Sequence, residues 1–329
     1  MPTDSPEIQC QVQQAGQTLR EQLLAIWPRA ISNSRPAETY PFLEQALDEC
    51  LKSLSATGLW GADNRAASAE LWKIVGDLLE VGWLQYQARH KPRGYAGDYE
   101  LLSRIWRSEV CDHPLGRHFD RYFQAQAAPR AVRNRMRMTA DWIVEGVQSS
   151  TAEFRVAIVG CGPGLEVVYA AEQLSNLERS RLSLTLLDLD PAAVDFAKQA
   201  LAPYFAADQL HCEQGNLFRL PKKQELAGRL NNADQIICTG LFDYFPDELA
   251  ATMLRTFWTR LAPGGSLRVF NFALHPTRAY MEWLGNWYLL YRTAADLRGL
   301  AEAAGVPDGA VNTGSEALGI DLLVSATKG

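Results

Sequence analysis

The spacing of apolar residues divides the chain into two parts with different periods. Up to about residue 125, apolar positions recur every three or four residues, as they do on the buried face of a helix. This spacing covers 18–27, 40–54 and 68–88, and a further helix is expected over 129–147. No alternating strand pattern of useful length occurs before residue 150. We therefore expect residues 1–125 to form an all-helical cap or lid domain.

From residue 154 onward, short runs rich in β-branched and aliphatic residues alternate with helical segments. Strands separated by crossover helices form a parallel sheet that is covered on both faces, and right-handed crossovers give a doubly wound arrangement. The last two strands are joined by a short link, which predicts an antiparallel ending. Residues 126–329 are thus expected to form an α/β domain. The expected strands cover 154–160, 183–190, 209–216, 233–240, 266–272, 309–317 and 320–327.

Charge narrows the class of ligand. The chain has 32 Lys+Arg and 38 Asp+Glu, which gives a formal net charge of -6. Both parts are mildly acidic, with 13 basic against 16 acidic residues up to residue 125 and 19 against 22 after it. A polyanion needs a positive face that displaces its counterions. We therefore expect a small-molecule substrate and not a nucleic acid.

Apolar runs, cysteines and histidines bear on compartment and metal binding. No apolar run reaches the roughly 18–20 residues needed to cross a bilayer, and the N-terminus lacks a signal-peptide pattern. Six scattered cysteines without a Cys-x-x-Cys pair are typical of free thiols in a reducing compartment. The five histidines form no i, i+4 pair near a carboxylate, which argues against a metal site. These features predict a cytoplasmic protein that binds neither membrane nor metal, and they leave the oligomeric state open.

The strongest local signal is the stretch VAIVGCGPGLEVV, in which a buried strand ends in a glycine-rich loop and a helix follows. Glycines let the backbone turn tightly and approach a ligand closely, and a helix N-terminus offers free N–H groups. A dinucleotide-binding loop would place its third glycine where Leu165 stands. The observed spacing of Gly160, Gly162 and Gly164 instead resembles the loop that wraps S-adenosylmethionine in class I methyltransferases.

The second strand ends in a carboxylate that supports the same interpretation. A carboxylate at this strand tip can accept two hydrogen bonds from a ribose diol. Asp188 stands three residues before Pro191, where the methyltransferase pattern has its acid. Asp190 alone would be interpreted as the N-cap of the next helix.

The resemblance to class I methyltransferases covers 154–329 and implies further roles. Asn216, after the third strand, would lie near the adenine amine, and Thr239, at the tip of the fourth, would face the reacting methyl group. Arg133 and Asn134, before the first strand, would bind the methionine carboxylate. The implied fold is a Rossmann-like, mostly parallel sheet with an antiparallel last strand, and the implied cofactor is S-adenosylmethionine.

Three further stretches narrow the resemblance: KPRGYAGDYELL, GLFDYF and NFALHPTRAYMEWLGNWYLLYRT. They resemble a bacterial family involved in making 3-hydroxypalmitic acid methyl ester, which implies O-methylation of a small or acyl carboxylate in secondary metabolism or signalling. They are also similar to azetidine-2-carboxylate synthases, in which the α-amine of S-adenosylmethionine attacks its own γ-carbon and methylthioadenosine is released. A third alternative is a non-catalytic cofactor-binding protein whose helical half recruits a partner.

These stretches also supply candidate catalytic and substrate-binding residues. The loop 93–98 is either a structured turn or a lid whose aromatic face attracts the sulfonium. A helix over 278–292 would place Tyr280, Trp283, Trp287 and Tyr291 on one face, either as core or as a pocket wall. An arginine of this segment would pair with a substrate carboxylate, and an acid or tyrosine would orient the nucleophile or accept a proton. The catalytic candidates are Tyr95, Asp243 and Tyr291; the substrate-binding candidates are Arg93, Tyr244, Arg278, Tyr280, Trp287 and Arg292.

Overall fold

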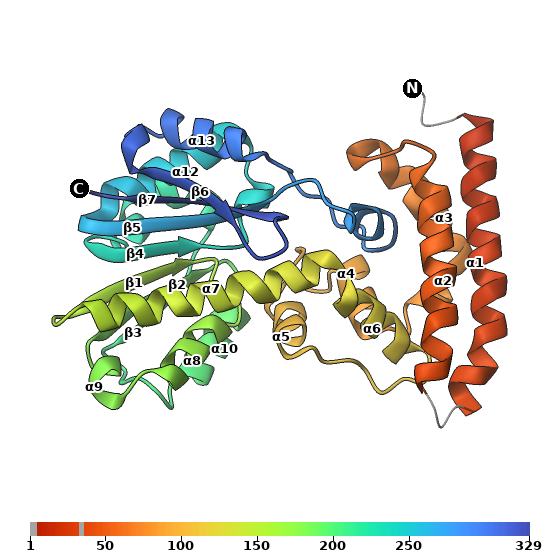
Figure 1. Cartoon of the computed structure of the whole chain (residues 1–329), viewed down its shortest axis with the longest axis horizontal. Coiled ribbons are helices and arrows are strands. Elements are labelled where there is room, and N and C mark those ends of the chain that lie inside the picture. Colours follow the sequence, from red (N-terminus) through yellow and green to blue (C-terminus); the bar gives the residue numbers. More distant parts are fainter. Residues whose placement is uncertain (1–4, 33–35) are drawn as a thin grey trace. The chain divides into compact units, whose positions relative to one another are not determined.

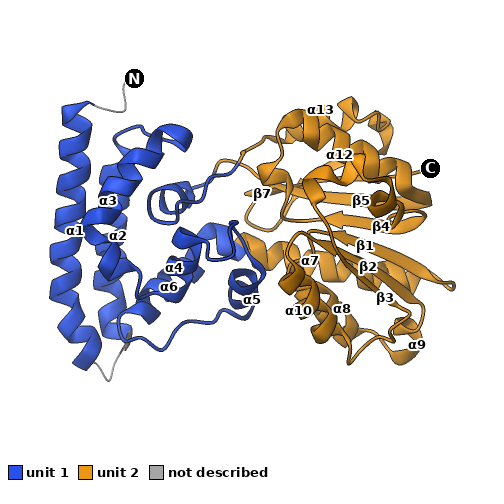
Figure 2. Cartoon of the chain, turned by 180° about the vertical axis from the view of Figure 1, so that it is seen from behind, with its two compact units in different colours: residues 1–130, 275–289 blue, residues 131–274, 290–329 orange. Residues whose placement is uncertain are grey.

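The computed structural model describes residues 5–32 and 36–329 and divides them into two compact units (Figure 2). The helical unit contains residues up to 130 together with 275–289, and the sheet unit contains 131–274 and 290–329. From the sequence, the boundary between the two domains was expected at residue 125, and residues 275–289 were expected to belong to the second domain. Across the described ranges, no helix is both long enough and apolar enough to span a membrane.

The helical unit contains no strand among its described residues (Figure 1). The apolar stripes of its first helices face one another, since Leu19, Leu23, Leu43 and Leu47 are all almost fully buried. The single helix expected over 68–88 is two helices, because the chain turns at residues 80–82. The helices are α1 (Pro6–Ser32), α2 (Pro36–Ser55), η1 (Gly61–Asp63), α3 (Asn64–Leu79), α4 (Trp83–His90), α5 (Tyr99–Arg107) and α6 (Gly116–Ala125).

The helix expected over 278–292 is wrong. Only a π-helical turn, η4 (Tyr280–Leu284), and the residues just before it are helical. Gly285 ends the turn, and Asn286 has a φ of 48°, in the left-handed region that continues no α-helix. The four aromatic residues of this segment therefore do not share one helical face.

The sheet unit holds seven strands in the order β3-β2-β1-β4-β5-β7-β6. The first five strands are parallel to their neighbours, as in the pairing of Val156 with Leu184, and β7 is antiparallel to both β5 and β6. This arrangement confirms the expected class I methyltransferase sheet with an antiparallel last strand. The strands are β1 (Phe154–Val159), β2 (Leu182–Asp188), β3 (Leu210–Gln214), β4 (Ala233–Cys238), β5 (Leu261–Phe272), β6 (Val311–Ser315) and β7 (Asp321–Thr327).

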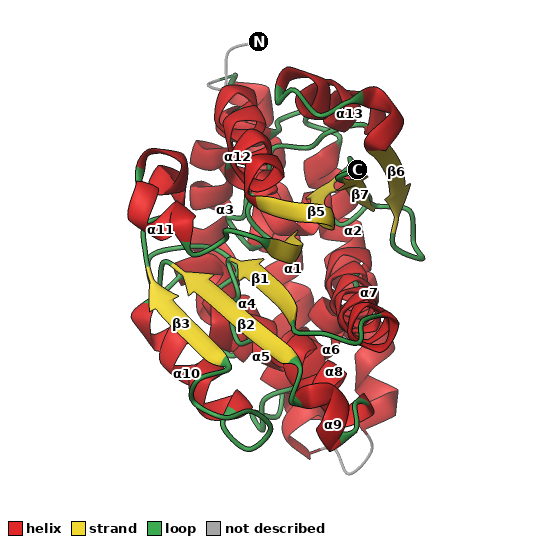
Figure 3. Ribbon diagram, turned by 90° about the vertical axis from the view of Figure 1, so that its left-hand side faces the viewer, coloured by secondary structure: helices red, strands yellow, loops and turns green. Residues whose placement is uncertain are grey.

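Helices cover both faces of this sheet (Figure 3). Side chains of α7, α8 and α10 share one apolar core with β1 and β2, and side chains of α11, α12 and α13 share the other with β4 and β5. The central strands β1, β2 and β4 are buried on both faces, which explains their nearly continuous apolar runs. The helices are α7 (Ala127–Ser149), α8 (Leu165–Gln173), α9 (Asn176–Arg179), α10 (Pro191–Leu201), η2 (Leu217–Lys222), α11 (Gln224–Gly228), η3 (Phe242–Tyr244), α12 (Asp247–Arg260), α13 (Ala294–Ala303) and η5 (Asp308–Ala310).

The strand order reverses direction at β1. The chain proceeds from β1 to β2 and β3 on one side, and then crosses to β4 on the other side of β1. The loops that leave β1 and β4 therefore diverge at the carboxyl edge of the sheet. Ligands of doubly wound folds bind outside this edge, at the switch point.

Candidate functional site at the carboxyl edge of the sheet

The glycine loop after β1 is held in a tight, left-handed path. Gly160, Gly162 and Gly164 have φ values of 76°, 49° and 63°, a region that glycine enters without steric cost. A Cβ at Gly160 would lie 2.9 Å from the side chain of Leu241, which follows β4. The loop therefore packs directly against the tip of β4 and requires glycine for both conformation and space.

Asp188 connects the loop to the end of β2. Its Oδ2 accepts a hydrogen bond from the Gly162 N–H at 2.8 Å, and its Oδ1 accepts one from the Asp190 N–H at 3.0 Å. Burial raises the pKa of Asp188 above its ordinary value, although these N–H groups oppose the shift. A carboxylate has about four acceptor positions, so Asp188 retains lone pairs for a ribose diol.

The neighbours of Asp188 fit a nucleoside. Leu189 exposes 38% of its surface beside the carboxylate and offers an apolar contact for a base. Asn216 is exposed two residues after the end of β3, as the N-cap of η2. Asp190 accepts a hydrogen bond from the Ala192 N–H at 2.9 Å, which confirms its expected role as the N-cap of α10. The groups at the tips of β1, β2 and β3 thus fit the adenosine part of the expected cofactor.

A buried charged cluster lies behind the loop, and we call Arg135, Glu166, Asp243 and Asp321 the strand-tip cluster. Nη1 of Arg135, on α7, donates to Oδ2 of Asp321 at 2.9 Å. Burial alone would lower the pKa of Arg135, but the carboxylates of Asp321 and Asp243 raise it. Within the part of the chain that the structure describes, Nε of Arg135 and Oδ1 of Asp321 have no hydrogen-bond partner. Three buried carboxyl groups therefore surround one guanidinium.

The carboxyl groups of this cluster resist ionisation. Burial raises the pKa of Glu166, in the first turn of α8, to about 7. Burial also raises the pKa values of Asp243 and Asp321, and the positive charge of Arg135 limits both shifts. A cationic ligand placed nearby would favour the ionised carboxylates, because opposite charges stabilise each other in a poorly solvated site.

Asp243 also has a structural contact. Its Oδ1 accepts a hydrogen bond from the Phe272 N–H at 2.7 Å, which ties the turn after β4 to the end of β5. Thr239 and Tyr244 flank it and are half-buried. The expected catalytic use of Asp243 stays a prediction, and it would act through the second carboxylate oxygen.

The two residues expected to bind a methionine carboxylate lie on α7 with different surroundings. The amide of Asn134 donates to Oε2 of Glu316 at 2.7 Å, so this side chain already has an anionic partner. Arg133 is half-buried. The guanidinium of the neighbouring, buried Arg135 would lie 3.5 Å from a Cβ at Gly240, which follows β4.

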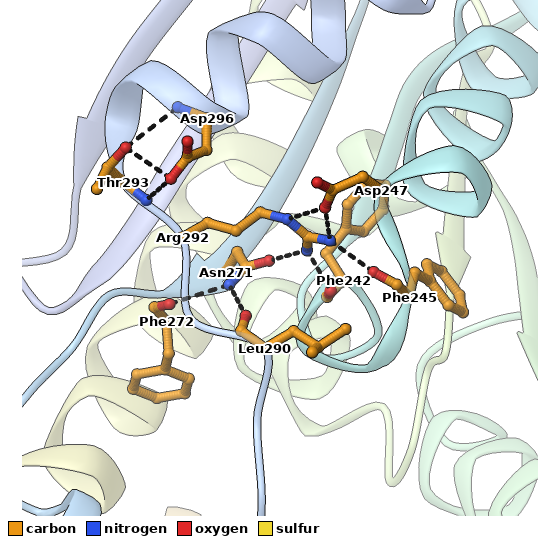
Figure 4. A network of polar contacts seen from close by, with 9 residues as sticks. All are labelled: Phe242, Phe245, Asp247, Asn271, Phe272, Leu290, Arg292, Thr293 and Asp296. Carbon is orange, nitrogen blue, oxygen red and sulfur yellow. Dashed lines mark hydrogen bonds and ion pairs between the residues drawn. The ribbon is translucent and has the colours of Figure 1, made fainter. Parts of the chain in front are cut away.

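Arg292 is the centre of a buried network that holds the carboxyl edge together (Figure 4). Its five N–H donors are all engaged, with acceptors from the turn after β4, the start of α12 and the end of β5. Nη2 donates to the Asp247 carboxylate at 2.6 Å, and Nη1 donates to Oδ1 of Asn271 at 2.6 Å. The other acceptors are the carbonyls of Phe242 and Phe245 and, through Nε, Asp247 again. This geometry favours a structural role over the expected pairing with a substrate carboxylate.

The loop 93–98 in the helical unit is a structured turn. Gly94 and Gly97 have positive φ values of 86° and 71°. Oδ1 of Asp98 accepts hydrogen bonds from the N–H groups of Glu100 and Leu101, both at 3.0 Å, and so caps α5. Arg93 lies 3.5 Å from the Glu100 carboxylate, and Tyr95 is half-buried. The turn interpretation holds for this loop, and its role as a lid stays a prediction.

Among the aromatic candidates, Tyr280 is core. It is 3% exposed, and its hydroxyl donates to Oε1 of Gln85. Trp287 and Tyr291 are both half-buried. Trp287 belongs to the helical unit, as Tyr280 does, and Tyr291 belongs to the sheet unit. Nε of Arg278 donates to Oε1 of Glu282 at 2.7 Å.

Comparisons with known proteins agree with this architecture. Residues 158–267 match a family model described as a methyltransferase domain. The fold is similar to that of a possible exported protein from Bordetella parapertussis, with 18% identity, 99% of each chain covered and a TM-score of 0.55. It is also similar to the carbon methyltransferase CurJ, with 15% identity, 98% of this chain and 92% of that chain covered, and a TM-score of 0.51. No curated protein sequence matches the chain.

Proposed function

We propose that the chain transfers the methyl group of S-adenosylmethionine to the carboxylate oxygen of a small or acyl acid. The observation that carries the proposal is the bond between Asp188 and Gly162, which fixes a glycine loop at the switch point of the sheet. The fold and the methyltransferase-domain match support S-adenosylmethionine as the cofactor.

Residues of the sheet unit would hold the cofactor in two parts. The glycine loop and Asp188 would bind the ribose, and Leu189 and Asn216 would contact the base. The negative potential of the strand-tip cluster would favour the ammonium and sulfonium groups of the amino-acid part.

Methyl transfer makes modest demands on acid–base chemistry. The methyl carbon is already activated by the sulfonium, so the protein must mainly align the nucleophile and exclude water. A carboxylate acceptor is already deprotonated, so the reaction needs no base to activate it. A nearby tyrosine hydroxyl, or Asp243 in its protonated form, would orient it by donating a hydrogen bond.

Product analysis of the purified chain tests the proposal. With S-adenosylmethionine and a panel of hydroxy and acyl acids, we expect S-adenosylhomocysteine and a methyl ester, detected by mass spectrometry. Methylthioadenosine formed without any acceptor would instead indicate the intramolecular cyclisation of the azetidine-2-carboxylate synthases. Cofactor binding without either product would indicate a binding protein.

A further inference from the structure

The helical unit concentrates positive charge where α3 begins and α4 ends. Arg65 lies on the first turn of α3, Arg89 on the last turn of α4, and Lys91 directly after it. Arg89 and Arg65 both lower the pKa of Lys91 to about 8, after the larger effect of burial, which shows that the three charges lie close together. We call Arg65, Arg89 and Lys91 the cation cluster.

The contacts of the cation cluster are with rings, a hydroxyl and carbonyls. The guanidinium of Arg65 lies 4.7 Å from the ring centre of Tyr288, and that of Arg89 lies 4.5 Å from the ring centre of Trp72. Nη1 of Arg89 donates to Oγ of Ser68 at 2.7 Å. Nζ of Lys91 donates to backbone carbonyls, the shortest of these bonds being 2.7 Å, to Asn286. Across residues 5–32 and 36–329, none of the three cations has a carboxylate partner.

Glu282, whose charge acts on Tyr288, already has two hydrogen-bond donors as partners. Oε1 of Glu282 accepts a hydrogen bond from Nε of Arg278 at 2.7 Å, and Oε2 accepts one from the Gly61 N–H at 2.7 Å. Glu282 therefore cannot balance the cation cluster as well. Arg89 and Lys91 are partly buried, and such cations are costly without a counter-charge. Protein sites usually satisfy them with an anion.

An unused donor lies in the same place. Oδ1 of Asn64 accepts a hydrogen bond from the Tyr288 hydroxyl at 2.9 Å, which places this amide beside the ring under Arg65. Asn64 is 0% exposed, and within the described part of the chain its Nδ2 has no hydrogen-bond partner. A buried N–H donor next to three cations calls for an acceptor atom with negative charge.

We propose that the cation cluster and Asn64 form a binding site for an oxyanion, the phosphate or carboxylate group of a small molecule. Arginine presents planar, paired donors that match the oxygens of either group, and lysine adds a point charge. A phosphate dianion balances more of the three charges than a carboxylate does, so phosphate should bind more tightly. The proposal concerns the helical unit alone and does not rest on methyl transfer.

NMR of the full chain tests this site through the lysine side-chain signals, with Lys91 assigned by its loss in Lys91→Arg. Inorganic phosphate and acetate are added in turn, and sodium chloride at matched ionic strength is the reference. An anion beside Lys91 stabilises its charged form, so phosphate should raise its pKa from about 8 toward the ordinary 10.5. A stronger response to phosphate indicates a phosphorylated ligand, and an equal response to acetate indicates a carboxylic acid.

Two variants make the test specific. Arg65→Met removes an exposed guanidinium that lies over the Tyr288 ring, and it should weaken phosphate binding by about tenfold, or about 1.4 kcal/mol. Lys73→Met removes an exposed cation of the same helix and should leave phosphate binding unchanged. The site is refuted if the pKa of Lys91 is the same in phosphate, acetate and chloride, or if Arg65→Met binds phosphate as the wild-type chain does.

Discussion

The two units concentrate opposite charges. The strand-tip cluster of the sheet unit places three buried carboxyl groups around one guanidinium. The cation cluster of the helical unit places three cations together with no carboxylate partner among the described residues. The first environment suits a ligand that carries positive charge, such as a sulfonium, and the second suits an acid. The contrast shows that a net charge of -6 says little about the ligands that each region accepts.

The largest effect on the sheet unit should come from Arg292. Replacing it by methionine removes three hydrogen bonds to buried acceptors and two to the exposed carboxylate of Asp247, and we expect the free energy of unfolding to fall by about 3–5 kcal/mol. Chemical denaturation measures this change. Arg298→Met, which removes an exposed ion pair with Asp308, is the control and should change stability by less than ~1 kcal/mol. A stable Arg292→Met protein with impaired turnover would restore the substrate-binding role.

The next effect is the pH dependence caused by Glu166. Its pKa is 4.5 in the unfolded chain and about 7 when folded, so the folded state holds the proton more tightly. The stabilising contribution is full below the unfolded pKa and is lost as pH rises through the folded one, by up to about 3 kcal/mol. As the pH rises from ~4.5 to ~7, the Glu166→Gln protein should therefore lose less stability than the wild-type protein does. Denaturation curves across this range measure the difference, and parallel pH profiles would contradict the assignment.

Asp188 should have a smaller effect, confined to cofactor affinity and loop order. Hydrogen bonds from a ribose diol to a buried carboxylate contribute roughly 1.5–3 kcal/mol each. Asp188→Ala should thus weaken S-adenosylmethionine binding by well over about tenfold in calorimetry. Asp195→Ala, on the exposed side of α10, is the matched control. Unchanged affinity in a folded Asp188→Ala protein would remove Asp188 from the site.

The smallest change in stability is expected for two tyrosines. Tyr95→Phe and Tyr291→Phe each remove only a hydroxyl, so the free energy of unfolding should stay within about 1 kcal/mol while turnover drops if the hydroxyl acts in the reaction. Melting temperature and product formation are measured on the same samples. Tyr86→Phe, at an exposed tyrosine of α4, is the control. Normal turnover in both variants would assign these residues to packing.

Local patterns predicted the sheet unit well. The strands have buried faces and are bounded by turns, and the glycine loop, Asp188 and the Asp190 cap all depend on residues close in the sequence. The same reasoning failed after β5, because Tyr280 and Trp283 have helical spacing while Gly285 and Asn286 end the helix. That dipeptide was the signal that could have prevented the error.

The strand-tip cluster was not predictable from local patterns. Asp321 and Arg135 are 186 positions apart and meet only because β7 pairs with β5 in a register that brings Asp321 opposite Phe272. Glu166, a charged residue beside the apolar residues that begin α8, was a usable signal. The cation cluster is similar, because α3 and α4 must pack together before its charges come close to one another.

Residues 275–289 interrupt the sheet unit in the sequence, and the contacts at the two ends of this segment have a consequence for protein engineering. The chain leaves the sheet unit after Leu274 and returns at Leu290. The N–H of Arg292 donates to the carbonyl of Phe272 at 3.0 Å, so exit and return lie side by side within the sheet unit itself. A short glycine linker could therefore span the gap, and residues 131–329 with this replacement should fold as a separate module onto which other insertions could be grafted.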